Sequence, residues 1–163
     1  VTLLGLKEPE FEYKDKSTFI KATLKCVEYL NYTTDRLSRV PTSMIVAMAG
    51  IESGWGTSRF AQEGNALFGV RTWDDNTPRM KAKGDPDAEW GVKKYKTKCE
   101  SVKDMIAIIN RHRAYKEFRE EREDQIDDGK WDYRRLMVRM SAWSTNPDYH
   151  EIVLQAIVDN KLP

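Results

Sequence analysis

The apolar residues between positions 41 and 53 repeat with the period of an α-helix. They recur at the i, i+3, i+4 and i+7 positions of a buried helical face: Met44, Ala47, Met48 and Ile51. We expect this helix to begin at Pro41, whose missing N–H has no partner in a first turn, with Thr42 or Ser43 as the cap. Gly54 and Gly56 should end it.

Glu52 continues an apolar row of this helix that includes Met48 and Ala49. A carboxyl group in that position should be partly desolvated at the edge of a cleft. Desolvation raises its pKa, as a general acid at neutral pH requires. On these residues alone, an ion pair between Glu52 and Arg59 explains the position equally well.

Further amphipathic helices are predicted on both sides of this segment. One begins at Ser17 and covers about four turns. Another begins at Ser101 and Asp104, which resemble a capping box. Helical patterns also occupy residues 114–122 and 149–157. The chain is therefore mainly α-helical.

Residues 70–98 interrupt the helical pattern. Their turn-forming residues prevent a long helix: Asn76, Pro78, Gly84, Pro86 and Gly91. We expect a small β lobe here, built on one irregular hairpin, and an extended arm over residues 1–16. The expected divisions of a single domain, 1–163, are the arm and first helix (1–40), the catalytic helix and loop (41–69), the β lobe (70–98) and the C-terminal helices (99–163).

Composition and charge narrow the functional classes. The chain has 163 residues, 33% of them charged, with a net charge of +1. This balance argues against disorder and against nucleic-acid binding through bulk charge. No apolar run is long enough to span a membrane, and no signal peptide is recognisable at Val1.

The cysteines and histidines offer few ligands for a metal. His112 and His150 lack partners at metal-ligand spacing, so we expect neither a metal nor another cofactor. Cys26 and Cys99 are compatible with one disulfide or with two buried thiols.

Three stretches resemble one known family. The most specific is IESGWGTSRFAQEGNALFGV, and the others are NRHRAYKEFREERE and WSTNPDYHEIVLQAIVDNKL. They resemble the peptidoglycan N-acetylglucosaminidases of the flagellar-muramidase and autolysin type, in particular the Bax-like branch. The resemblance covers roughly residues 40–162.

The resemblance implies a lysozyme-like helical fold with a cleft beside the β lobe. It implies an endo-β-N-acetylglucosaminidase that cleaves the β-1,4 bond between N-acetylglucosamine and N-acetylmuramic acid in peptidoglycan. Glu52 matches the general acid of the family, and Glu89 best matches its second carboxylate, with Asp85 and Asp87 as the fallback. Tyr149 matches a tyrosine near the cleft.

Aromatic and amide side chains are candidates for binding sugars, because pyranose faces stack on rings and amides pair with acetamido groups. Core packing and turn formation are the competing explanations for each. The candidates are Trp55, Asn65, Phe68, Trp73, Tyr115 and Trp143.

Two other functions are compatible with these residues. A lytic transglycosylase needs only one acid/base and releases 1,6-anhydro products, and an inactive wall-binding module is the second alternative. We expect a monomer that acts on glycan strands in the periplasm or at the cell wall, as an autolysin, a phage lysin or a secreted effector. A retaining, inverting or substrate-assisted mechanism remains open.

Overall fold

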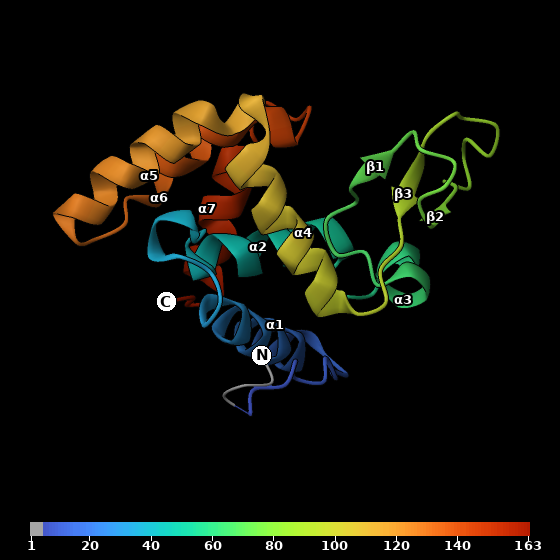
Figure 1. The fold of residues 1–163 in the computed structure, drawn as a ribbon, viewed down its shortest axis with the longest axis horizontal. Coiled ribbons are helices and arrows are strands. Elements are labelled where there is room, and N and C mark those ends of the chain that lie inside the picture. The colour runs from blue at the N-terminus through green and yellow to red at the C-terminus, as the bar shows by residue number, and fades with distance from the viewer. Residues whose placement is uncertain (1–4) are drawn as a thin grey trace.

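Helices form most of the molecule, and short strands form a lobe at one side of it (Figure 1). The computed structural model describes residues 5–163, so the first four residues of the expected N-terminal arm lie outside the described part. The helices are α1 (Lys16–Asn31), α2 (Thr42–Ser53), α3 (Arg59–Gly64), α4 (Lys98–Arg111), α5 (Lys116–Asp128), α6 (Tyr133–Met137) and α7 (Tyr149–Asp159). Short 3₁₀ segments are η2 (Arg36–Ser38), η3 (Arg113–Tyr115) and η4 (Val138–Trp143). The mainly helical fold with a small β lobe is confirmed.

Helix α2 is the central element of the core. All residues from 43 to 50 are buried, rather than those of one face only. The reason is that α1 and α7 both pack against this helix. Gly54 ends it in the left-handed conformation with a φ of 59°, as the glycine pattern predicts. Glu52 therefore projects from the last turn of a rigid, buried helix.

The caps of two helices differ from those expected. Pro41 precedes α2 as its N-cap residue without a side-chain capping bond, because the proline ring has no polar atom that could accept one. Helix α1 begins after Asp15, whose side chain accepts from the Thr18 N–H while the Thr18 hydroxyl accepts from the Asp15 N–H. Ser17 is thus inside the helix and does not cap it. Both differences concern the ends of helices, which are the part of a helix that local sequence patterns specify least well.

Helix α4 begins three residues before the expected start. The Thr97 side chain caps it by accepting from the Glu100 N–H at 3.1 Å. Ser101 is consequently helical, and Asp104 is free to accept a hydrogen bond from the Tyr95 hydroxyl at 2.6 Å. The residue expected to cap α4 instead links this helix to the β lobe.

The β lobe is a three-stranded antiparallel sheet rather than a single hairpin. Its strands β1 (Arg71–Thr72), β2 (Arg79–Met80) and β3 (Gly91–Lys93) lie in the order β1-β3-β2. The chain crosses over after β2, so that β3 becomes the central strand. Strands of two or three residues carry too little alternation to be recognised in the sequence.

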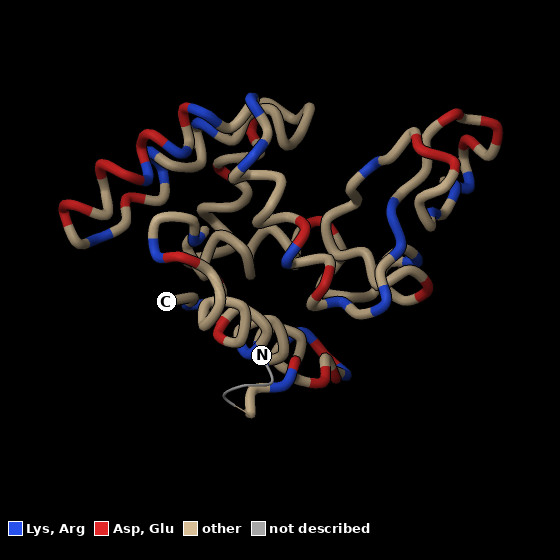
Figure 2. The backbone as a smooth tube through the Cα atoms, viewed as in Figure 1, with Lys and Arg blue, Asp and Glu red and all other residues tan. Residues whose placement is uncertain are grey.

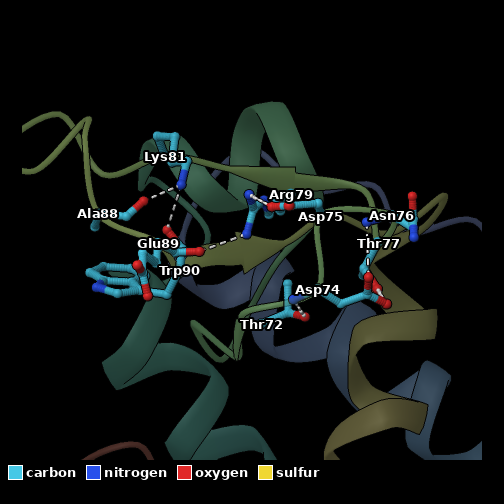
Figure 3. A network of polar contacts seen from close by, with 10 residues as sticks. All are labelled: Thr72, Asp74, Asp75, Asn76, Thr77, Arg79, Lys81, Ala88, Glu89 and Trp90. Atoms are coloured by element: carbon cyan, nitrogen blue, oxygen red, sulfur yellow. Dashed lines mark hydrogen bonds and ion pairs between the residues drawn. The ribbon is translucent and has the colours of Figure 1, made fainter.

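Side chains hold the loops of this lobe through backbone carbonyl groups (Figure 3). Arg79 forms an ion pair with Asp75 and donates to the carbonyl of Glu89 at 2.9 Å. Lys81 donates to the carbonyl groups of Ala88 and Trp90. The segment leading into β3 is therefore tied to β2 by two cations.

Cys26 on α1 and Cys99 on α4 form a buried disulfide. Of the two possibilities that the sequence left open, the structure shows the cross-link. It joins residues 73 positions apart and fixes the first helix of the chain against α4. Disulfides of this kind persist in oxidising compartments.

Charged residues are spaced along α5 and along the neighbouring helix α6 (Figure 2). Glu121 on α5 is buried and lies 3.4 Å from both Arg135 and Arg139. The charged run of α5 is thus a packing surface on its inner side. Across residues 5–163, none of the helices is long and apolar enough to cross a membrane.

Candidate active site

A cleft of about 670 Å³ lies between the helical part and the β lobe. Its walls come from the end of α2, the segment leading into β1, the end of α4, and the 3₁₀ segments η3 and η4. Glu52 is the one carboxylate among the described residues that line it. The cleft therefore presents a single acidic group amid aromatic and basic side chains.

Glu52 has the environment expected of a general acid. The residue is open to the cleft, yet the surrounding protein displaces enough water to raise the pKa of its carboxyl group. Within the described part of the chain it forms no salt bridge. Arg59 instead donates to the carbonyl of Lys81 at 2.6 Å. The ion-pair explanation for Glu52 is therefore wrong.

Tyr149 is buried at the start of α7, which packs against α2. Its hydroxyl makes no hydrogen bond of standard geometry with the described residues, but it interacts with Glu52 electrostatically. Burial first, and then the Glu52 charge, raise the pKa of Tyr149, so the phenol stays protonated. The same interaction opposes the rise in the pKa of Glu52.

This coupling predicts the effect of Tyr149→Phe on the pH profile. Removing the hydroxyl removes the influence that lowers the pKa of Glu52, so that pKa should rise further. A general acid is lost when it deprotonates, so the alkaline limb of kcat/KM should move to higher pH. Rates measured on one substrate between about pH 4 and 9 test this. An alkaline limb that stays in place or moves to lower pH would disprove the coupling.

Aromatic side chains form the apolar walls of the cleft. The Trp143 ring lies 6.2 Å from Phe68 at an interplanar angle of 89°, and 5.9 Å from Tyr115. Trp73, on the β-lobe side, is 64% exposed. The Trp73 indole is therefore not a core residue, and its ring is available to the cleft. These four candidates share one cavity.

Two further candidates lie outside the lining of the cleft. Trp55 packs edge-on against Phe19 and covers Gly50, where a Cβ atom would collide with the indole. Asn65 adopts the left-handed conformation at the end of α3 and donates to the carbonyl groups of Tyr95 and Lys96. Both are placed for structural roles, and sugar contacts by them stay a prediction.

The carboxylates predicted in the β lobe are also outside the cleft lining. Asp85, Asp87 and Glu89 are exposed on the segment between β2 and β3 (Figure 3 shows Glu89). The structure does not bring any of them to the cleft wall beside Glu52. A catalytic role for Glu89 therefore stays a prediction.

The sequence reasoning missed a cationic edge of the cleft. Lys93 on β3 and Arg111 at the end of α4 both line it, and both face the carboxylate of Asp104. Tyr95 joins the same carboxylate, and burial, followed by the Asp104 bond, raises the pKa of the phenol. Nothing in the spacing of these residues indicates that they meet.

Comparison with known proteins places this cleft in a family. The model of the glucosaminidase family, described as mannosyl-glycoprotein endo-beta-N-acetylglucosaminidase, matches residues 31–162. The chain belongs to this glucosaminidase family. It is accordingly a glycoside hydrolase domain, and Glu52, Phe68, Trp73, Tyr115 and Trp143 all lie within the matched region.

Relatives agree with this assignment. Protein bax of Escherichia coli K12 is 35% identical over 92 residues, which are 56% of this chain and 32% of that protein. The match thus spans about a third of that relative, and the Bax-like resemblance is confirmed.

Solved structures show the same fold. The catalytic domain of the autolysin Auto from Listeria monocytogenes has a TM-score of 0.64 at 17% identity, over 98% of this chain and 90% of that one. The FlgJ glycoside hydrolase domain of Salmonella typhimurium has a TM-score of 0.59 at 18% identity. The match covers 91% of this chain and 99% of that one.

Proposed function

We propose that this glucosaminidase domain hydrolyses the β-1,4 bond between N-acetylglucosamine and N-acetylmuramic acid in peptidoglycan, with Glu52 as general acid. The observation that carries the proposal is a carboxyl group of raised pKa at the end of a buried helix, in a cleft with aromatic walls. Protonation of the leaving oxygen by such a group is the first requirement of glycoside hydrolysis. One protein of similar fold is the autolysin Auto and another is a peptidoglycan hydrolase from Sphingomonas sp. A1, which supports this substrate.

Two routes can complete the reaction. In one, Glu89 acts as base or charge stabiliser, which requires the β lobe to close over the bound glycan because Glu89 is outside the cleft lining. In the other, the N-acetyl group of the substrate attacks, and the protonated Tyr149 helps to orient it. The second route needs no carboxylate beyond Glu52.

The first route predicts that Glu89→Gln is strongly impaired, by about a hundredfold or more in kcat. Asp85→Asn and Asp87→Asn, on the same exposed segment, are matched controls that should keep their activity. Digestion of purified sacculi by the three variants measures this. Activity near wild type in Glu89→Gln, with a loss in either aspartate variant, would transfer the role to that aspartate. Full activity in all three would favour the substrate-assisted route.

A lytic transglycosylase is the second candidate, because the described cleft lining contains one carboxylate and that reaction needs one acid/base. Mass spectrometry of the digested muropeptides separates the two. Hydrolysis adds one water per cleavage and leaves N-acetylglucosamine at the new reducing end. Products that lack this water and end in 1,6-anhydromuramic acid would overturn the hydrolase proposal.

The proposed site of action is the bacterial envelope, where this substrate is found. The Cys26–Cys99 disulfide supports a site outside the reducing cytoplasm.

A further inference from the structure

The cationic edge of the cleft is built from two consecutive elements, β3 and α4. The Lys93 ammonium lies 3.2 Å from one oxygen of the Asp104 carboxylate, and the Arg111 guanidinium lies 3.9 Å from the other. Both cations also line the cleft that contains Glu52, whereas Asp104 does not. The Asp104 carboxylate, which lies behind the cleft wall, thus contacts two cations on the surface of that wall.

The charges in this group do not balance. Asp104 supplies one negative charge to two positive ones, and its oxygen that faces Lys93 also accepts from the Tyr95 hydroxyl at 2.6 Å. Arg111 keeps most of its donors available, because its side chain is 64% exposed and its contact with Asp104 is long. The edge therefore retains a net positive charge and unused donors that face the cleft.

Arg71 also lines the cleft but differs in its surroundings. Its guanidinium lies over the Trp90 ring, 4.0 Å from the ring centre, and it forms no salt bridge with a carboxylate of residues 5–163. Lys93 and Arg111 are instead oriented by a common anchor. Guanidinium and ammonium groups fixed side by side are suited to a carboxylate, because charge-assisted hydrogen bonds are short and strong.

We propose that Lys93 and Arg111 bind a carboxylate of the glycan substrate, and that Asp104 acts as the positioning residue for both. The inference rests on the proposed function, since it assigns this edge to the same cleft. The carboxylate has two possible sources in peptidoglycan, the lactyl group of the muramic acid and the stem peptide attached to it. In either case the domain selects an acidic glycan over a neutral one with the same backbone.

Matched glycan strands test the proposal and separate the two sources. The first substrate consists of strands with intact stem peptides. The second consists of strands freed of peptide, so that the lactyl carboxylate is exposed. The third consists of peptide-free strands in which that carboxylate has been converted to a methyl amide. We expect the wild-type domain to cleave the best carboxylate substrate with a kcat/KM about tenfold or more above that of the amide. Preference for the first substrate indicates the stem peptide, and preference for the second indicates the lactyl group.

Variants connect this preference to the two cations. Arg111→Gln should raise KM for the preferred substrate with little change in kcat, and Arg111→Glu should reduce or invert the preference. Asp104→Asn should also weaken the preference for the carboxylate substrate. Thermal melting shows whether this variant remains folded. Arg113→Gln removes the same charge from an exposed neighbour that does not line the cleft, and should behave as wild type.

The outcomes are distinguishable from a failure of the proposed function. Equal cleavage of all three strands by the wild-type domain, or an equal loss on the preferred and amide strands in Arg111→Gln, overturns the inference while leaving hydrolysis intact. If the wild-type domain cleaves none of the three strands, the proposed function itself fails.

Discussion

Glu52→Gln should abolish clearing of purified sacculi while leaving their binding intact. Glutamine keeps the size of the side chain but has no acidic proton to give to the leaving oxygen. The loss of a positioned general acid lowers kcat by roughly a hundredfold to ten-thousandfold. The aromatic walls of the cleft are unchanged by this substitution, so co-sedimentation with sacculi should match the wild-type protein.

Glu63→Gln is the matched control for this experiment. Glu63 is exposed on α3, close in sequence to Glu52, and does not line the cleft. It should clear sacculi at the wild-type rate. Unchanged clearing by Glu52→Gln would remove Glu52 from the mechanism, and lost binding would show that the side chain acts in recognition instead.

The second large effect is expected from removing the disulfide. In the double variant Cys26→Ala and Cys99→Ala, the unfolded chain regains the freedom of a loop that spans 73 positions. The chain-entropy model gives about 4 kcal/mol for a loop of this length. For a domain of this size, that corresponds to a decrease in Tm of about 10 °C.

Thermal and urea unfolding of the double variant measure this effect, and the wild-type protein under reducing conditions provides the comparison. The reduced protein should show most of the same decrease, because it loses the cross-link but keeps both side chains. A Tm that stays unchanged in both would mean that the packing of α1 against α4 suffices without the bond. Activity at low temperature should survive, because neither cysteine lines the cleft.

The helical elements and the position of Glu52 were predictable because they depend on local patterns. The periodicity of α2 and the glycines that follow it place Glu52 at a helix end, and the structure agrees. Phe68, Trp73, Tyr115 and Trp143 reach one cleft as aromatic candidates should. Their selection from the aromatic residues of the chain needed the family resemblance as well as the residues themselves.

The candidates that lie outside the cleft lining owe their positions to long-range packing. Trp55 and Asn65 belong to the same conspicuous motif as Glu52, but one covers the core and the other caps α3. The crossover of the β lobe carries Glu89 to an exposed segment away from the cleft wall. A motif indicates which residues are near each other in the chain, whereas side-chain directions depend on what each backbone segment packs against.

The fold class, the family and the position of Glu52 at a helix end could be predicted from the sequence alone. These follow from hydrophobic periodicity and from a compact motif, both of which act over a few residues. Three features became evident only in the folded structure: Cys26 is bonded to Cys99, Glu52 has no ion pair among the described residues, and Lys93 and Arg111 both contact Asp104. Two of these contacts join different elements, α1 to α4 and β3 to α4, so no short-range pattern in the sequence encodes them.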